Sequence, residues 1–242
     1  MRIPSRLLRT ALVIAFALNG NLSIAQVKFG PKGGLSFSEL PNHTKYIIGG
    51  EQIYNGYHIG IIGDIRLYEQ LFLQPGLFLS NKGSEYIVGN DSAGSTTGFS
   101  NFEFSSFYAD IPLDLVYKFN MGPVKLLIIA GPQLGYGLSG KWTASYGTSA
   151  KVHFGNGPND DLKPFDFGVN FGGGFEVARI QLSLQYYLGL ATLSTMTPPI
   201  EEQKFKVLTV SIGYLFGNDE RVYNDYKSKY LRKHKQNKAH WR

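Results

Sequence analysis

Residues 57–67 read YHIGIIGDIRL, and the two kinds of position in this stretch differ in character. The odd-numbered positions are Tyr, Ile, Ile, Gly, Ile and Leu, whereas the even-numbered positions include His58, Asp64 and Arg66. Successive side chains of a β-strand point to opposite faces. The period of two therefore predicts a strand with one apolar and one polar face.

The same alternation recurs outward from this stretch. It is present at 27–37, 71–80, 108–118, 128–139, 166–177, 180–189 and 208–216, and it is weakest in the first. The links after 57–67, 108–118 and 166–177 are minimal turns. The other links, at about 38–55, 82–101, 140–163 and 194–203, are long and polar. This plan predicts an all-β fold, an eight-stranded antiparallel transmembrane β-barrel (a meander) with short periplasmic turns and long extracellular loops.

A soluble lipocalin-like barrel has the same periodicity, so the residue types must decide which face meets water. In a soluble barrel the polar face meets water and favours Lys, Glu and Thr. Here that face is rich in glycine, at Gly60, Gly76, Gly131, Gly135, Gly137, Gly168, Gly172, Gly174 and Gly213. Glycine suits the crowded lumen of a narrow barrel. The apolar face is therefore predicted to meet outer-membrane lipid, where closed strand pairing satisfies every backbone group.

The two ends of the chain differ from its middle. Arg2, Arg6 and Arg9 precede an apolar run at 11–18, and small residues follow at 23–25. This is typical of a cleaved signal peptide over 1–25, because the run is shorter than the roughly 20 residues of a transmembrane anchor. The barrel is predicted over 26–216 and a basic tail over 217–242. An even number of strands places both mature termini in the periplasm of a Gram-negative cell.

Charge and cysteine content exclude several function classes. The formal net charge of +6 arises from the basic ends, and the barrel region between them carries no basic excess. A nucleic-acid-binding surface on the barrel is therefore not expected. The absence of cysteine excludes disulfides, thiolate metal sites and cysteine nucleophiles.

Charged residues on the lumen face form a predicted salt-bridge cluster near the periplasmic turns. Its members are Asp64, Arg66, Asp114, Lys118, Lys125, Glu176 and Arg179. Charges buried in a narrow lumen must be paired or hydrogen-bonded. Eight strands leave a lumen just wide enough for side chains. We therefore expect a plug rather than a proton or ion path, and a barrel that does not conduct.

The sequence offers little catalytic chemistry. His43, His58 and His153 are the histidines placed near the external rim, but no spacing sets a nucleophile beside a base. The segment 156–161 contains two carboxylates, at Asp160 and Asp161, without the spacing of a calcium loop, which favours a solvated loop. We expect no catalytic residue, no cofactor and no metal site.

The tail has two open interpretations. Tyr223, Tyr226 and Tyr230 have the spacing of an amphipathic helix, and basic residues follow. The basic residues of interest are Lys227, Lys229, Arg232 and Lys233. The segment is either a disordered solvated extension or a docking site for secretion-complex proteins of the periplasm or outer membrane, or for lipid phosphates.

Five short motifs resemble one known family. They are FGPKGGLSF at 29–37, LQPGL at 73–77 with KG at 82–83, IPL at 111–113, AGP at 130–132 and GYLF at 213–216. Together they resemble the small outer-membrane β-barrel (porin-like) family, and the PorT-type members of that family in particular. The resemblance covers about 27–216 and implies a non-enzymatic barrel needed for type IX protein secretion. The chain departs from the family pattern in continuing past Phe216.

Two alternatives to the secretion role stay open. One is a small porin or envelope-structural barrel with no part in secretion. The other is an outer-membrane lipase or protease working at the external rim, which would depend on His153 or His43.

Overall fold

The computed structural model describes residues 27–40, 51–89, 99–144, 147–157, 160–195 and 203–217. Residues Phe29–Phe216 form one compact unit. The predicted signal peptide and the tail residues beyond 217 lie outside the described residues. Among the described residues, no helix is long and apolar enough to cross a membrane.

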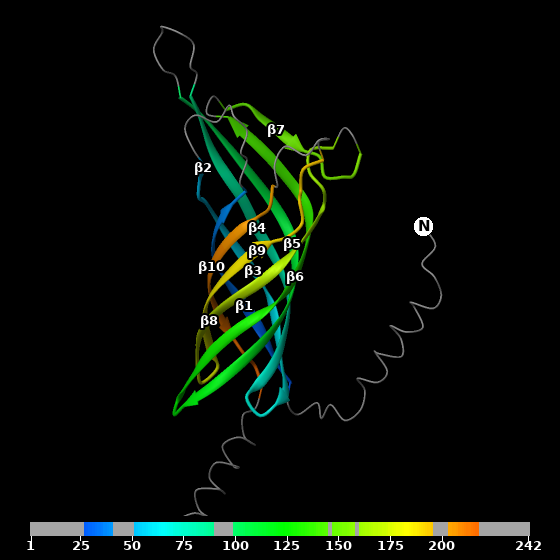
Figure 1. The fold of residues 1–242 in the computed structure, drawn as a ribbon. Helices are drawn as coiled ribbons and strands as arrows, with labels where there is room; N and C mark the ends of the chain where they lie inside the picture. Colours follow the sequence, from blue (N-terminus) through cyan, green and yellow to red (C-terminus); the bar gives the residue numbers. More distant parts are fainter. Residues whose placement is uncertain are drawn as a thin grey trace, which may run out of the picture. The chain divides into compact units, whose positions relative to one another are not determined.

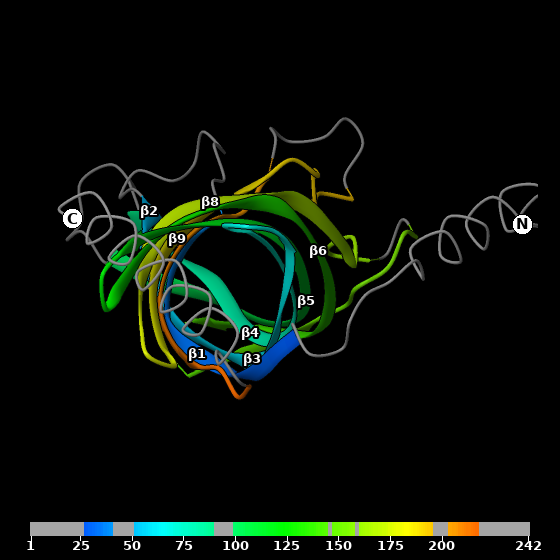
Figure 2. The same cartoon turned by 90° about the horizontal axis from the view of Figure 1, so that it is seen from below.

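Most of the described residues of this unit lie in strands (Figure 1). They are β1 (Val27–Glu39), β2 (Glu51–Gln52), β3 (Tyr54–Tyr68), β4 (Leu71–Gly89), β5 (Phe99–Met121), β6 (Val124–Ala144), β7 (Ser149–Val152), β8 (Phe165–Val177), β9 (Ile180–Gly189) and β10 (Lys206–Tyr214). All but the short β2 and β7 join in a closed ring in the order β1, β3, β4, β5, β6, β8, β9, β10. Figure 2 shows this ring along its axis. The predicted eight-stranded antiparallel barrel is confirmed.

The two ends of the barrel are built differently. Tight turns at 69–70, 122–123 and 178–179 join strand pairs at one end, which we call the turn end. The longer connections lie at the opposite end, the loop end. The pairing of β1 with β10 closes the ring, with Lys32 opposite Gly213 and Glu39 opposite Lys206.

Burial confirms which face of the strands lines the lumen. Along β3, Ile59 and Ile61 on the outer face are each 62 % exposed, whereas Asp64 on the inner face is fully buried. Lys118 of β5 is likewise buried inside the ring. The apolar outer wall and polar interior are the reverse of a soluble barrel and match a barrel surrounded by lipid.

Aromatic side chains gather at two levels of the outer wall. Pairs in ring contact are Tyr57–Phe107 and Tyr136–Phe165 toward the loop end, and Tyr117–Phe119 and Tyr214–Phe216 toward the turn end. Along β5, the residues from Phe107 to Tyr117, at about 3.3 Å each and tilted by about 40°, rise roughly 25 Å. This is the height of the apolar band in barrels that span a membrane.

The predicted loop at 82–101 is largely wrong. Strands β4 and β5 stay paired as far as Gly89 opposite Phe99, so only 90–98 lies outside the described residues. The pattern is hidden because polar residues occupy both faces here, with Lys82 and Ser84 pointing in and Glu85 pointing out. The predicted loop at 140–163 also contains strand, since β6 runs to Ala144 and β7 pairs back onto it. Figure 1 shows β4, β5 and β6 rising beyond the other strands at the loop end.

An extra residue in β6 changes which of its side chains face inward. The pairing with β5 shifts at Phe107, where Ser139 lies opposite Phe107 but Gly137 lies opposite Tyr108. Leu138 is thus a bulge, which reverses the in-and-out alternation beyond it. As a result Trp142 packs against the buried apolar cluster at the loop end.

Candidate functional site

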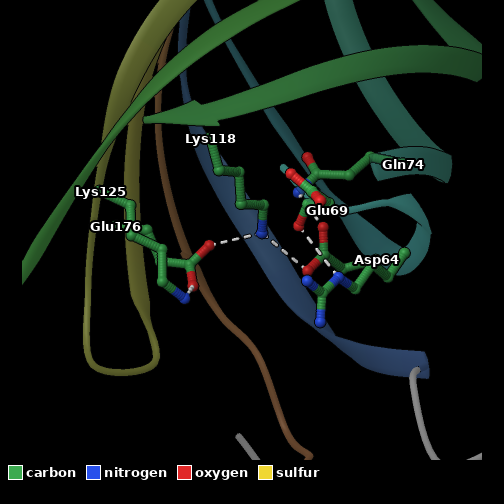
Figure 3. Close-up of polar contacts among 7 residues, drawn as sticks. Asp64, Glu69, Gln74, Lys118, Lys125 and Glu176 are labelled. Carbon is green, nitrogen blue, oxygen red and sulfur yellow. Dashed lines mark hydrogen bonds and ion pairs between the residues drawn. The ribbon is translucent and has the colours of Figure 1, made fainter. Parts of the chain in front are cut away.

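Ion pairs cross the lumen near the turn end. Lys118 Nζ lies 2.7 Å from Asp64 Oδ2 and 2.6 Å from Glu176 Oε2. Glu176 also accepts from Lys125 Nζ at 2.8 Å, and Gln74 Nε2 donates to Asp64 Oδ1 at 2.7 Å. Figure 3 shows the Lys118 ammonium between the two carboxylates. We call these five residues the turn-end network.

The network spans the full width of the ring. Asp64 belongs to β3 and Glu176 to β8, with β4, β5 and β6 between them on one side and β9, β10 and β1 on the other. Lys118 extends from β5 and is 1 % exposed. Each carboxylate has a cation partner, which offsets the desolvation of charges held inside the barrel.

Three members of the predicted cluster lie elsewhere. Arg66 Nε donates to the main-chain oxygen of Glu69 at 3.0 Å, since the strand register is irregular beside it. Arg179 is exposed in the turn that follows Ala178, which has a positive φ of 54°. Asp114 lies with a second group of lumen residues instead. The expectation of one cluster containing all seven residues is wrong for these three.

Apolar residues pack beside the turn-end network inside the lumen. Val116, Leu127 and Ile129 form a buried cluster against Phe72. Lys118 Nζ also lies 4.2 Å from the centre of the Phe72 ring, a cation–π contact. Sequence reasoning missed this cluster because residues 126–129 read LLII, a run without polar contrast between the two faces.

A small polar cavity occupies the middle of the barrel. Its volume is about 60 Å³, which has room for a few water molecules. At its wall Lys32 Nζ donates to Gln185 Oε1 at 3.0 Å, and Gln185 Nε2 donates to Asp114 at 2.9 Å. Asn170 Nδ2 donates to Gln133 at 3.0 Å. Amide side chains therefore link the buried charges of this level.

His58 lies in this cavity wall rather than at the rim, so its predicted position is wrong. Its Nε2 is hydrogen-bonded to Ser211 Oγ at 2.9 Å, and the residue is 8 % exposed. Its Nδ1 has no hydrogen-bond partner among the described residues. His58 is therefore a buried residue in the wall of the central cavity.

Lys82 of β4 closes the cavity on the side of the loop end. Its Nζ lies 2.8 Å from Asp110 Oδ1 and 3.9 Å from Asp166 Oδ2. The ring centres of Tyr108 and Tyr187 are each 5.0 Å away, and that of Phe205 is 5.7 Å away. We call these six residues the Lys82 cage. It escaped prediction because Lys82 fell in a predicted loop.

Glycine makes room for the cage. A Cβ atom at Gly168 would lie 2.6 Å from the Tyr187 ring, and one at Gly135 would lie 2.9 Å from Asp110 Oδ1. At these two positions the absence of a side chain leaves space that Tyr187 and Asp110 occupy.

Described residues of three loop-end connections meet the ends of the strands in one apolar core, which we call the cap. Its buried members are Leu40, Tyr86, Phe104, Tyr108, Val152, Leu162, Tyr187, Leu193, Phe205 and Val207, with Trp142 and Phe154 packed against them. Leu40 follows β1, Leu162 follows β7, and Leu193 follows β9. The connections were expected to be solvated, but among their described residues Leu40, Leu162 and Leu193 are buried.

The loop after β7 is held by its own carboxylates. Asp160 Oδ2 accepts from the main-chain N–H of Gly157 at 2.7 Å, and Asp161 Oδ2 accepts from that of His153 at 2.8 Å. These bonds make the two acids part of the loop's own structure. No cluster of metal-ligating residues occurs within the described ranges. His43 and all the tail residues considered above lie outside those ranges.

Comparison with known proteins identifies the family. The model of the outer membrane protein beta-barrel domain family matches residues 18–194. One similar solved structure is that of Ail, the attachment invasion locus protein of Yersinia pestis, in complex with the heparin analogue sucrose octasulfate. It is 12 % identical to this chain, with a TM-score of 0.41, and the match covers 79 % of this chain and 99 % of the Ail chain. Neisserial surface protein A is 14 % identical with a TM-score of 0.40, covering 78 % of this chain and 97 % of its own. No curated protein matches the chain. The chain belongs to the outer membrane protein beta-barrel domain family.

Proposed function

We propose that this protein is a non-enzymatic integral protein of the outer membrane whose lumen does not conduct ions. The observation that carries this proposal is the Lys118 ammonium, which joins Asp64 and Glu176 across the whole width of the lumen. The turn end faces the periplasm, with both termini, and the loop end faces outward. The protein acts through its surfaces rather than through its lumen.

Two barriers in series support a closed lumen. The turn-end network and its apolar neighbours close one side of the central cavity, and the Lys82 cage with the cap closes the other. Passage of an ion would separate Lys118 or Lys82 from its carboxylates. Breaking a buried pair costs about 3–5 kcal/mol, because it leaves an uncompensated charge.

Ion efflux from liposomes tests the closed lumen. The full chain is folded into vesicles loaded with potassium, and release is followed with an ion-selective electrode. We expect vesicles with the folded barrel to release potassium no faster than vesicles that contain heat-denatured protein. Sustained release in proportion to the amount of folded barrel would reject the proposal.

The absence of enzymatic activity is also part of the proposal. His58 and Ser211 are the hydrogen-bonded histidine and serine of the described residues, and they face a cavity of only about 60 Å³. His153 at the loop end is instead beside Asp161, with Nδ1 3.6 Å from Oδ2. Hydrolysis of lipid or peptide that disappears in His153→Ala would contradict this and favour a rim enzyme.

Within this role we propose a PorT-like part in type IX protein secretion. The proposal rests on the resemblance of the motifs at 29–37 and 73–77 to PorT-type proteins, with the basic tail as the segment that docks to the secretion complex. Deleting the gene should leave cargo that carries the type IX C-terminal signal in the periplasm. An unchanged secretome would reject this role and leave a structural barrel.

Truncation after Phe216 then tests the tail separately. The truncated protein should still assemble, as judged by heat-modifiable mobility on gels, but should secrete less cargo. Normal secretion by an assembled truncation would reject tail docking and leave the secretion role of the barrel standing.

A further inference from the structure

Two lysines face each other on the outer wall at the loop end. Lys141 of β6 lies directly opposite Lys151 of β7, and both are exposed. The next residue of each strand, Trp142 or Val152, packs into the cap. Because side chains alternate along a strand, the two lysines point outward. In Figure 1, β6 and β7 lie together at this end of the barrel.

The pair carries positive charge that the described part of the chain does not neutralise. Like charges directly opposite each other on neighbouring strands destabilise a sheet. Neither lysine forms an ion pair with a described acid. Across β5 the neighbour of Lys141 is Ser105, and Glu103 occupies only a diagonal position, opposite Thr143. The pair thus has the charge and the free donors to bind an anion.

The height of the pair matches the headgroup layer of a membrane. Tyr136 and Leu138 of β6 are lipid-facing, at 45 % and 52 % exposed. Lys141 follows Leu138 by a rise of roughly 8 Å, taking about 3.3 Å per residue and a tilt of about 40°. Lysines at this depth extend their charge into the headgroups while their methylenes cover apolar surface.

We propose that Lys141 and Lys151 together bind the phosphate group of an anionic membrane lipid in the leaflet at the loop end. A phosphate oxygen accepts strong hydrogen bonds from ammonium groups. One phosphate between the two ammoniums removes their repulsion. The acyl chains of the same lipid then lie along the apolar wall below, beside Tyr136 and Leu138, which a free phosphate ion cannot do.

Lys206 of β10 provides a matched control. It is also exposed on the outer wall near the loop end, but it lies directly opposite Glu39 of β1 and beside Leu188 of β9. The ammonium group of Lys206 therefore has the carboxylate of Glu39 at the facing position of the neighbouring strand. Removing it should not change phosphate binding.

The site is tested by native mass spectrometry of the full chain in detergent, which measures the binding of added phosphatidylglycerol. Phosphatidylcholine, which is zwitterionic, is the comparison lipid. A basic residue near an anionic surface contributes about fivefold in affinity, so K141Q/K151Q should bind phosphatidylglycerol about 30-fold more weakly. Lys206→Gln should bind as the wild type does. Heat-modifiable gel mobility verifies that each variant is folded.

Three outcomes would overturn the proposal. The first is a double variant that binds phosphatidylglycerol as tightly as the wild type does. The second is a Lys206→Gln variant whose affinity for phosphatidylglycerol falls as much as that of the double variant. The third is displacement of the lipid by an equal concentration of inorganic phosphate, which would identify a free anion rather than a lipid as the ligand.

Discussion

Asp64 and Glu176 lie on opposite sides of the barrel and hydrogen-bond to the same ammonium group, that of Lys118. A contact of this kind ties strands that are not neighbours in the sheet. It also shows how a lumen of this width holds buried charges, since Lys82, Lys118 and Lys125 each reach a carboxylate on another strand. The closed lumen that we propose rests on this geometry.

Removing the shared ammonium should destabilise the barrel. Lys118→Met retains most of the side-chain volume but leaves Asp64 and Glu176 buried with fewer partners. We expect a loss of about 3–5 kcal/mol in the free energy of unfolding, measured by urea titration in detergent micelles. Lys125→Met is the control, because this lysine is partly exposed and its replacement should lower the free energy of unfolding by less.

Neutralising the whole set should recover much of that stability. In the triple variant D64N/K118M/E176Q both carboxylates are neutral and only the partly exposed Lys125 loses its charged partner, so unfolding should return toward the wild-type midpoint. A triple variant that is less stable than Lys118→Met would show that the ion pairs are not the source of the loss.

A side chain at Gly168 should disturb the Lys82 cage. Its Cβ would lie 2.6 Å from the Tyr187 ring and would clash with the main-chain oxygen of Leu188. Gly168→Val should therefore destabilise the fold by about 1–3 kcal/mol through overpacking, measured by the same urea titration. Gly63→Ala is the comparison, since its nearest neighbour would be Pro75 at 3.4 Å. Equal stability of the two variants would argue against a tightly filled cage.

Truncating the cap should loosen the loop end alone. Phe205 is fully buried between the cage and the cap, so Phe205→Ala should cost about 3–5 kcal/mol and open the loop-end connections. Limited proteolysis of the folded barrel should then cut these connections faster, while the turn end stays resistant. Phe165→Ala is the control, because Phe165 is 66 % exposed on the outer wall. Equal cleavage rates would mean that the cap does not depend on this core.

The sequence predicts the barrel because its wall obeys one simple rule. In 57–67, every second residue meets lipid and the rest meet a polar interior, so the period of two is visible. The rule fails where the surroundings change. Beyond the apolar band, Lys82 on the inner face of β4 and Glu85 on its outer face are both polar. At 126–129 the residues on both faces are apolar. Neither stretch has the contrast that periodicity needs.

The site was only partly predictable for a related reason. Depth along a strand placed Asp64, Lys118, Lys125 and Glu176 together, since all lie close to a turn. Partners across the lumen depend on side-chain reach and on the stagger of strands around the ring. The cage around Lys82 depends on both, and the cap also requires loop residues to fold back. Neither leaves a local pattern in the sequence.

Single-channel recording in planar bilayers tests the central claim most directly, using wild type, Lys118→Ala and Lys125→Gln. Because the Lys82 cage and the cap close the other side of the cavity, the two barriers in series predict no stable open-channel current for any of the three proteins. Stable open-channel current through the wild-type barrel would contradict a closed lumen, and openings in Lys118→Ala would show that the Lys82 cage and the cap do not close the loop end.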